Sequence, residues 1–122
     1  VLSSYEVLGG PATFNVLWTT SKFHDQNPRI YRAFLGALEE AMVFINGPDK
    51  RAVAELWIAA EKSRLDPDFV EKILRDPENV FTTTPQNVMK YVEFMHKVGS
   101  IKEMPASWQD MFFPEIHAKP GS

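Results

Sequence analysis

Residues 27–47 read NPRIYRAFLGALEEAMVFING and give the clearest helix signal in the chain. The segment opens on Asn27-Pro28, an N-cap residue followed by proline at the first helical position. Gly47, followed by another proline, ends it. Between these limits the apolar residues recur at helical spacing, at Ile30, Phe34, Leu38, Ala41 and Ile45. The pattern predicts a helix over residues 28–46 with one apolar stripe.

The same start signals recur further along the chain. Asp49, Asp66-Pro67 and Thr84-Pro85 each place a capping residue before an apolar periodic run. The further helices predicted are 49–63, 67–76, 85–98 and 107–113. Together the five helices cover about half the chain, against about a third in an average domain. We therefore expect a mostly α chain.

Upstream of these helices, Thr13–Thr20 (TFNVLWTT) is the best strand candidate. Apolar side chains fall on both faces, which is typical of a strand inside an α/β sheet. A single strand cannot satisfy its own backbone groups, and the chain offers no second strand of equal strength. An unpaired strand of this kind is an association template. We therefore expect a homodimer or a swapped assembly through Phe14, Val16 and Trp18, with hinge freedom at Gly9-Gly10.

Composition excludes several classes of function. The 122 residues carry 13 basic and 16 acidic side chains, a net charge of −3, so no basic excess points to nucleic acid. Cysteine is absent, which removes disulfides, thiol nucleophiles and thiolate metal sites. No apolar run approaches the ~20 residues of a membrane span. The chain opens on Val1-Leu2 without Met or an export signal, which suggests processing, trimming or a fragment.

No catalytic or metal-binding constellation emerges from the residue pattern. The histidines lack ligand spacing, although His24 and Asp25 are placed to pair. Serine occurs outside any nucleophile elbow, and Gly9-Gly10-Pro11 lacks the spacing of a phosphate loop. We therefore predict no metal, no cofactor and no enzymatic activity. Phe112-Phe113 is expected to pack, or alternatively to leave an exposed patch for a partner.

The order of several motifs resembles one protein family. The series comprises Trp18-Thr19-Thr20-Ser21-Lys22-Phe23, Asn27-Pro28, Ala33-Phe34-Leu35-Gly36-Ala37-Leu38-Glu39-Glu40-Ala41, Phe81-Thr82-Thr83-Thr84-Pro85, Phe94-Met95, Val98-Gly99-Ser100-Ile101 and Pro105-x-x-Trp108-x-Asp110-x-Phe112. In this order the chain is similar to the C-terminal portion of periplasmic solute-binding proteins of ABC transporters. The subfamily is the nitrate/sulfonate/taurine type, which includes thiamine-pyrimidine-precursor-like proteins.

The resemblance implies a C-terminal piece of an α/β periplasmic-binding-protein fold of type II. Residues 1–12 would cross between lobes, with Val1-Leu2 ending a strand of the second lobe. Residues 13–122 would form part of the first lobe. The parent protein would capture a small solute in the periplasm and present it to an ABC permease. Near the cleft, the hydroxyls of Ser3, Ser4 and Tyr5 could reach a ligand as neutral donors, or could only shape the turn.

Two alternatives to the transport function stay open. Pyrimidine-precursor synthases share the fold implied by the resemblance, so the parent could be such an enzyme, acting through a histidine and metal-binding cysteines that lie outside this chain. Alternatively, the chain is a free-standing helical interaction module with Phe112-Phe113 as its contact patch.

Overall fold

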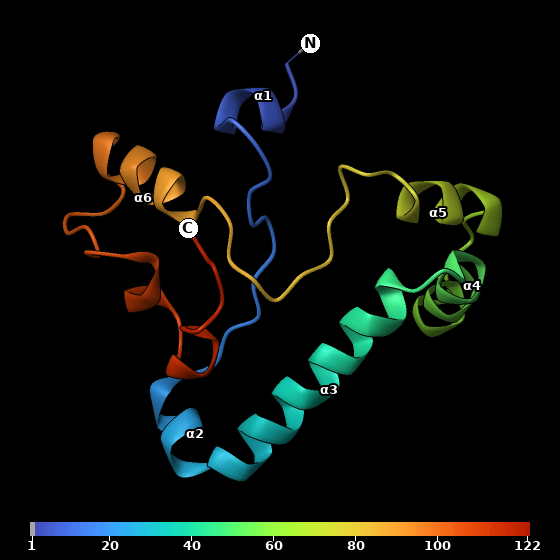
Figure 1. Cartoon of the computed structure of the whole chain (residues 1–122), viewed down its shortest axis with the longest axis horizontal. Coiled ribbons are helices and arrows are strands. Elements are labelled where there is room, and N and C mark those ends of the chain that lie inside the picture. Colours follow the sequence, from blue (N-terminus) through green and yellow to red (C-terminus); the bar gives the residue numbers. More distant parts are fainter. Residues whose placement is uncertain (1) are drawn as a thin grey trace. The chain divides into compact units, whose positions relative to one another are not determined.

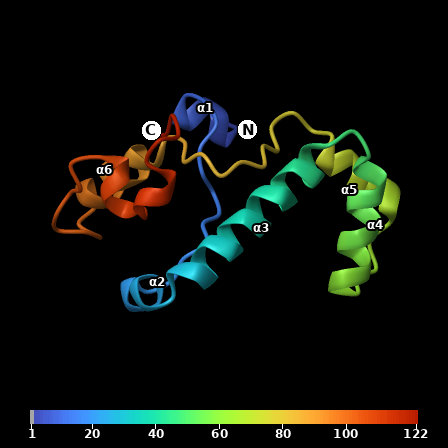
Figure 2. The ribbon, with the colours of Figure 1, turned by 60° about the horizontal axis from the view of Figure 1, so that its bottom comes forward.

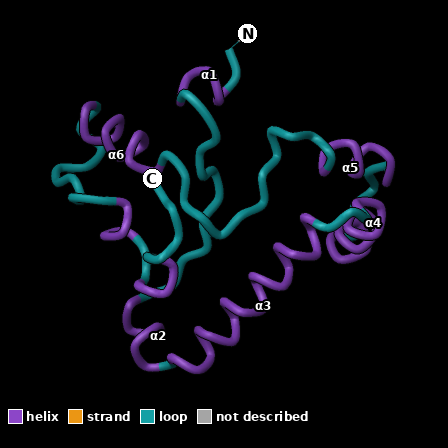
Figure 3. Tube along the Cα trace, viewed as in Figure 1, coloured by secondary structure: helices purple, strands orange, loops and turns teal. Residues whose placement is uncertain are grey.

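The structure is a computed structural model that describes residues 2–122. Within these residues it contains six α-helices and two short 3-10 helices joined by loops (Figures 1 and 3). The α-helices are α1 (Ser4–Leu8), α2 (Ser21–Gln26), α3 (Pro28–Asn46), α4 (Lys50–Glu61), α5 (Pro67–Leu74) and α6 (Val88–Lys97). The 3-10 helices are η1 (Trp108–Met111) and η2 (Pro114–Ile116). The predicted mostly helical character is confirmed.

Helix α3 begins and ends at the residues that the sequence predicts. Pro28 occupies its first position, where the missing N–H would have had no intrahelical partner. At the other end, the N–H of Gly47 donates to the carbonyl of Phe44 at 3.1 Å. The side chain of Asn27 does not cap the helix; its Nδ2 donates to the carbonyl of Phe23 at 3.0 Å. Asn27 thereby ties the end of α2 to the start of α3.

The chain divides into two compact units. One unit is Trp18–Phe81, which contains helices α2, α3, α4 and α5. The other joins residues 2–17 to Thr82–Ser122 and contains α1, α6, η1 and η2. Each unit is built from its own buried residues and its own hydrogen bonds.

The core of the unit Trp18–Phe81 lies between α4 and α5, which pack against each other (Figures 1 and 2). Val53 and Ala54 of α4 and Val70 of α5 are buried there. Aspartates begin both helices: the side chains of Asp49 and Asp66 accept backbone N–H groups of the first turn at 3.0 and 2.7 Å. The short connection between the helices then brings their apolar faces together.

In the other unit, residues 85–88 hold the N-terminal arm. The N–H of Thr13 donates to the carbonyl of Gln86 at 2.8 Å, and the N–H of Gln86 donates back to Thr13 Oγ1 at 2.8 Å. The neighbouring Asn87 adds a bond from its Nδ2 to the carbonyl of Pro11 at 2.7 Å. Three bonds thus fix residues 11–13 against a segment more than seventy positions away.

Residues 85–88 also hold the C-terminal end of the chain, which Figure 1 shows beside the start of α6. The N–H of Ser122 donates to the carbonyl of Pro85 at 3.1 Å, and the N–H of Val88 donates to the carbonyl of Ser122 at 2.8 Å. Gly121 lies against the buried indole of Trp108, where an added Cβ would stand 2.7 Å from Cε2. The tail therefore closes over Trp108 and completes a small core with α6.

The predicted strand Thr13–Thr20 is wrong, and with it the α/β part of the predicted fold class. Residues 2–122 contain no strand and no sheet, so the described chain is all-helical and is not a piece of an α/β type II periplasmic-binding fold. The physical reason is the missing partner: among the described residues 2–122, residues 14–19 form no backbone–backbone hydrogen bond. The predicted second-lobe strand at Val1-Leu2 begins outside the described residues.

The predicted helix 85–98 also differs, because α6 starts only at Val88. Gln86 and Asn87 are engaged in the long-range bonds described above, and Asn87 adopts a left-handed backbone with φ 51°. Gly99, the expected left-handed residue after this helix, has φ 76° as predicted. Residues 2–12, expected as a connector, contain the one-turn helix α1. These differences all lie in the unit held together by contacts distant in sequence.

Burial is sparse for a chain of this length. The accessible surface is 9289 Å², whereas two separate compact domains of these sizes would expose about 8,000 Å² together. Among residues 2–122, the buried apolar residues are Val53, Ala54, Val70, Val88, Val92 and Trp108. About 1,000 Å² or more of surface is therefore exposed beyond what compact folding leaves.

Replacing Gly121 by alanine is expected to lower the free energy of unfolding by about 1–3 kcal/mol, because the new methyl group would overlap the Trp108 ring. The matched control is Gly36→Ala in α3, where no neighbouring atom lies within 4 Å. This control is expected to raise stability by about 0.5–1 kcal/mol. Urea unfolding of both variants makes the comparison. An unchanged stability for Gly121→Ala would show that the tail does not lie on Trp108.

Candidate functional site

An apolar groove with a volume of about 510 Å³ opens on the unit Trp18–Phe81. Helices α3, α4 and α5 supply most of its wall. Its lining residues are Ala41, Phe44, Ile45, Val53, Leu56, Trp57, Ala60, Leu65, Val70, Ile73, Leu74 and Phe81. We take this apolar groove as the candidate site of the unit Trp18–Phe81.

Local sequence explains how the groove walls are placed. Gly47-Pro48 ends α3 and lets the chain turn directly into α4. Asn46 then fixes one rim, since its Nδ2 donates to the carbonyl of Phe81 at 2.8 Å. Several lining side chains remain exposed to solvent: Leu56 is 60% exposed and Trp57 is 44% exposed. The groove is therefore open to an apolar group from solvent.

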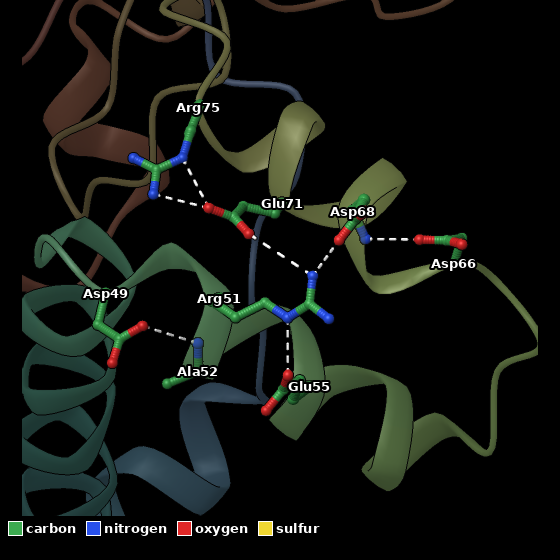
Figure 4. A network of polar contacts seen from close by, with 8 residues as sticks. All are labelled: Asp49, Arg51, Ala52, Glu55, Asp66, Asp68, Glu71 and Arg75. Carbon is green, nitrogen blue, oxygen red and sulfur yellow. Dashed lines mark hydrogen bonds and ion pairs between the residues drawn. The ribbon is translucent and has the colours of Figure 1, made fainter.

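A charged network joins α4 to α5 beside these apolar walls (Figure 4). Arg51 Nε donates to Glu55 Oε1 at 2.7 Å, and its guanidinium also pairs with Asp68 on α5. Glu71 lies 3.8 Å from the same guanidinium and receives two bonds from Arg75 at 2.9 and 2.7 Å. The hydrogen bonds to Glu55 and Asp68 raise the pKa of the Arg51 guanidinium above its usual value. Arg51 is thus a permanent cation that links the two helices.

The chemistry of the groove is that of apolar binding. All twelve lining side chains are aliphatic or aromatic, and none of them ionises or acts as a nucleophile. Such a surface binds by removing apolar area from water, at roughly 25 cal/mol per Å². It can orient a hydrophobic group, but it offers no acid, base or anion-binding group within its walls.

The predicted ligand-binding residues Ser3, Ser4 and Tyr5 lie at the start of α1, in the other unit. Ser3 Oγ accepts the N–H of Glu6 at 3.2 Å, and Glu6 Oε2 accepts the N–H of Ser3 at 2.7 Å, which forms a capping box. Ser3 and Tyr5 are half-buried and Ser4 is exposed. The capping role of Ser3 still leaves its hydroxyl proton available for donation. Their binding role stays a prediction.

Helix α1 is held to α6 by one long-range contact. Lys90 Nζ donates to the carbonyl of Leu8. The lysine side chain thereby satisfies a carbonyl at the end of α1, where a helix has no partners of its own. Residues 3–5 are consequently part of an ordered turn rather than a free arm.

His24 and His117, two of the three histidines, make structural contacts. His24 Nδ1 lies 2.8 Å from Asp25 Oδ1, as the sequence suggests, and its ring meets Tyr31 edge-on at 4.6 Å. His117 packs edge-on against Trp108 at 5.9 Å. Among residues 2–122 no group of three or more potential metal ligands comes together.

The Phe112-Phe113 patch is only partly available to a partner. Both residues are half-buried. The ring of Phe112 packs edge-on against Trp108 with 5.9 Å between ring centroids.

No helix within residues 2–122 is both long enough and apolar enough to cross a bilayer.

Comparison of the chain with known protein families, with curated proteins and with solved structures finds no match.

The groove was not among the sites predicted from the sequence. The apolar faces of the predicted helices 28–46, 49–63 and 67–76 were the sequence pattern that pointed to it. These helices supply ten of the twelve lining residues: Ala41, Phe44, Ile45, Val53, Leu56, Trp57, Ala60, Val70, Ile73 and Leu74. Periodicity identifies these faces, but it does not show that they leave a gap.

Changing Ile73 to glutamate is expected to abolish most binding of a neutral hydrophobic dye such as Nile red, because it puts a carboxylate in an all-apolar wall. The matched control is Ile30→Glu, at a position 59% exposed on α3 and outside the groove. This control is expected to keep the dye affinity. Fluorescence titration measures both variants, and equal loss in both would mean that the dye binds elsewhere.

Replacing Arg51 by methionine is expected to destabilise the α4–α5 pair at low salt, since it removes the cation shared by Glu55 and Asp68. The deficit should shrink in 1 M NaCl, where charges on the surface are screened within about 3 Å. The control is Arg64→Met, because Arg64 is an exposed arginine of the same unit that lies outside this network. Urea unfolding at both salt concentrations provides the measurement. A deficit independent of salt would contradict the electrostatic role.

Proposed function

We propose that the chain is a non-catalytic part of a solute-binding protein that serves an ABC transporter of the nitrate/sulfonate/taurine type. The observation that carries the proposal is the ordered series of motifs from Trp18 to Phe112, which spans most of the chain. The proposal concerns function alone and requires no sheet within these 122 residues.

The roles of the matched residues support this proposal. Asn27-Pro28 joins α2 to α3, and Ala33–Ala41 forms the middle of α3. Trp108 is the buried centre of the other unit, and Asp110 accepts the backbone N–H of Ser107 at 3.1 Å in a capping box. These three motifs therefore fall on residues that organise the structure.

The exposed surface gives a second line of support. Phe14 is 87% exposed and Trp18 is 85% exposed, which is unfavourable for a polypeptide that works alone in water. A part that acts within a larger solute-binding protein would have such side chains covered by the remainder. In this proposal the parent acts in the periplasm, takes up a small anion or pyrimidine, and delivers it to the membrane permease.

Within that function, Ser3, Ser4 and Tyr5 are proposed as neutral hydroxyl donors to the solute. Hydroxyls suit the oxygens of nitrate, sulfonate or carboxylate groups because they donate without placing a counter-charge in the site. The capping box at Ser3 orders the turn that presents them. This arrangement would orient the solute and would not transform it.

The groove favours a second candidate function, a helical module that binds an apolar helix of another protein. Its twelve apolar lining residues, several of them exposed to solvent, fit the hydrophobic face of such a helix. Loss of partner binding in Ile73→Glu, with no solute binding by the parent protein, would favour this candidate. Iron-dependent activity on a pyrimidine precursor would instead favour an enzyme.

The isolated 122-residue chain is expected to bind neither nitrate, sulfonates nor pyrimidines, because three hydroxyls cannot enclose a solute. Calorimetry should show no heat above dilution. The product of the complete reading frame that encodes these residues is expected to bind one of these solutes with micromolar or tighter affinity. Micromolar binding by the 122 residues would contradict the first expectation. Absence of binding by the complete product, together with unimpaired solute uptake in a deletion strain, would contradict the proposed function.

A further inference from the structure

Helix α3 carries a seam of exposed apolar residues at coiled-coil spacing. The seam consists of Ile30, Phe34, Ala37 and Ala41, which follow one another at intervals of four, three and four residues. This is the spacing of the two core positions in a heptad repeat. All four residues are exposed, and the two large ones, Ile30 and Phe34, are 59 and 56% exposed. A helix with such a seam is stabilised in water when a second helix covers it.

The rest of the unit Trp18–Phe81 does not cover this seam. The structure describes all nineteen residues of α3, Pro28–Asn46, and none of them is buried. Ala41 is the one seam residue that lines the apolar groove, and the other three lie outside it. The exposed seam therefore runs from the wall of the groove toward the start of α3, the long helix in Figure 2.

The side chains of the seam are complementary to themselves in the antiparallel direction. A two-fold axis midway between residues 35 and 36 would place Phe34 of each copy opposite Ala37 of the other. In the same register Ile30 would lie opposite Ala41. Each large side chain then meets a small one, which lets two helices approach closely and interdigitate. A parallel pair would instead set phenylalanine against phenylalanine and alanine against alanine.

The charges beside the seam favour the same register. Arg29 and Glu40 are both exposed, and they lie on the same side of α3 because about three turns separate them. In the antiparallel register, Arg29 of one copy lies about 3 Å along the helix axis from Glu40 of the other. The two-fold axis creates this pairing twice. A parallel pair would set arginine beside arginine and glutamate beside glutamate, so the charges select the antiparallel direction.

We infer that α3 is a self-association helix that pairs antiparallel with α3 of a second copy of this chain through Ile30, Phe34, Ala37 and Ala41. An interface of two identical surfaces about a two-fold axis needs a self-complementary pattern. Both the side-chain sizes and the charges of α3 have this pattern, which favours a second copy over a helix of another protein. The inference rests on neither function proposed above, and it involves α3 rather than the segment Thr13–Thr20.

The first test measures the mass of the 122-residue chain by sedimentation at about 100 μM. The wild type is expected to give twice 13.9 kDa. Phe34→Lys should raise the dissociation constant about a hundredfold, because each dimer loses two aromatic contacts from its seam. Val43→Lys is the matched control, since Val43 is 75% exposed and lies on the opposite side of α3 from Phe34. It should leave the dimer intact. A monomeric wild-type chain, or equal weakening by both variants, would overturn the inference.

A charge exchange tests the register without changing the seam. Arg29→Glu and Glu40→Arg should each raise the dissociation constant about tenfold at low salt, because like charges then meet at two places in the dimer. The double variant should regain the wild-type constant. Within one chain the two positions lie about 16 Å apart, so the rescue reports contact between copies. Circular dichroism checks that all variants keep the helical content of the wild type. Single variants as tight as the wild type, or a double variant without rescue, would overturn the antiparallel pairing.

Discussion

Buried backbone N–H and C=O groups need hydrogen-bond partners, and this requirement organises the unit that joins residues 2–17 to Thr82–Ser122. The six helices satisfy most of their groups internally. The remaining segments must find partners at a distance. Residues 85–88 are where they do so, because Thr13, Pro11 and Ser122 all bond to this one short segment. The unit formed by the two ends of the chain exists because of these bonds, and its small core around Trp108 is built upon them.

The prediction of helices from the sequence succeeded where local signals decide the outcome. Asn27-Pro28 and Gly47 marked the limits of α3 correctly, since proline at the first position and glycine at the end act within one turn. The same type of signal at Thr84-Pro85 misplaced the start of α6 by three residues. There the competing contacts come from residue 13 and residue 122, and no local pattern reveals them.

The strand prediction went wrong for a related reason. The residues Thr13–Thr20 have strand-like composition, but composition cannot supply the second backbone that a sheet requires.

The candidate groove shows a different limit of sequence-based prediction. The apolar faces of α3, α4 and α5 were readable from periodicity, yet the opening between them depends on how the helices pack. Ser3 was predicted as a ligand-binding residue because of its hydroxyl, and in the structure that hydroxyl caps the N-terminus of α1.

The sequence distance of the contacts at residues 85–88 has a consequence for the order of folding. The α4–α5 pair closes a short loop, so it can form as soon as residues 50–74 have left the ribosome. The bonds from Gln86 and Asn87 span 73 and 76 positions, and those between Ser122 and residues 85 and 88 span more than thirty. Loop-closure entropy delays such contacts. During synthesis, residues 2–17 must therefore wait without their native partners, and a chaperone that shields apolar segments would find its target there rather than in the helical pair.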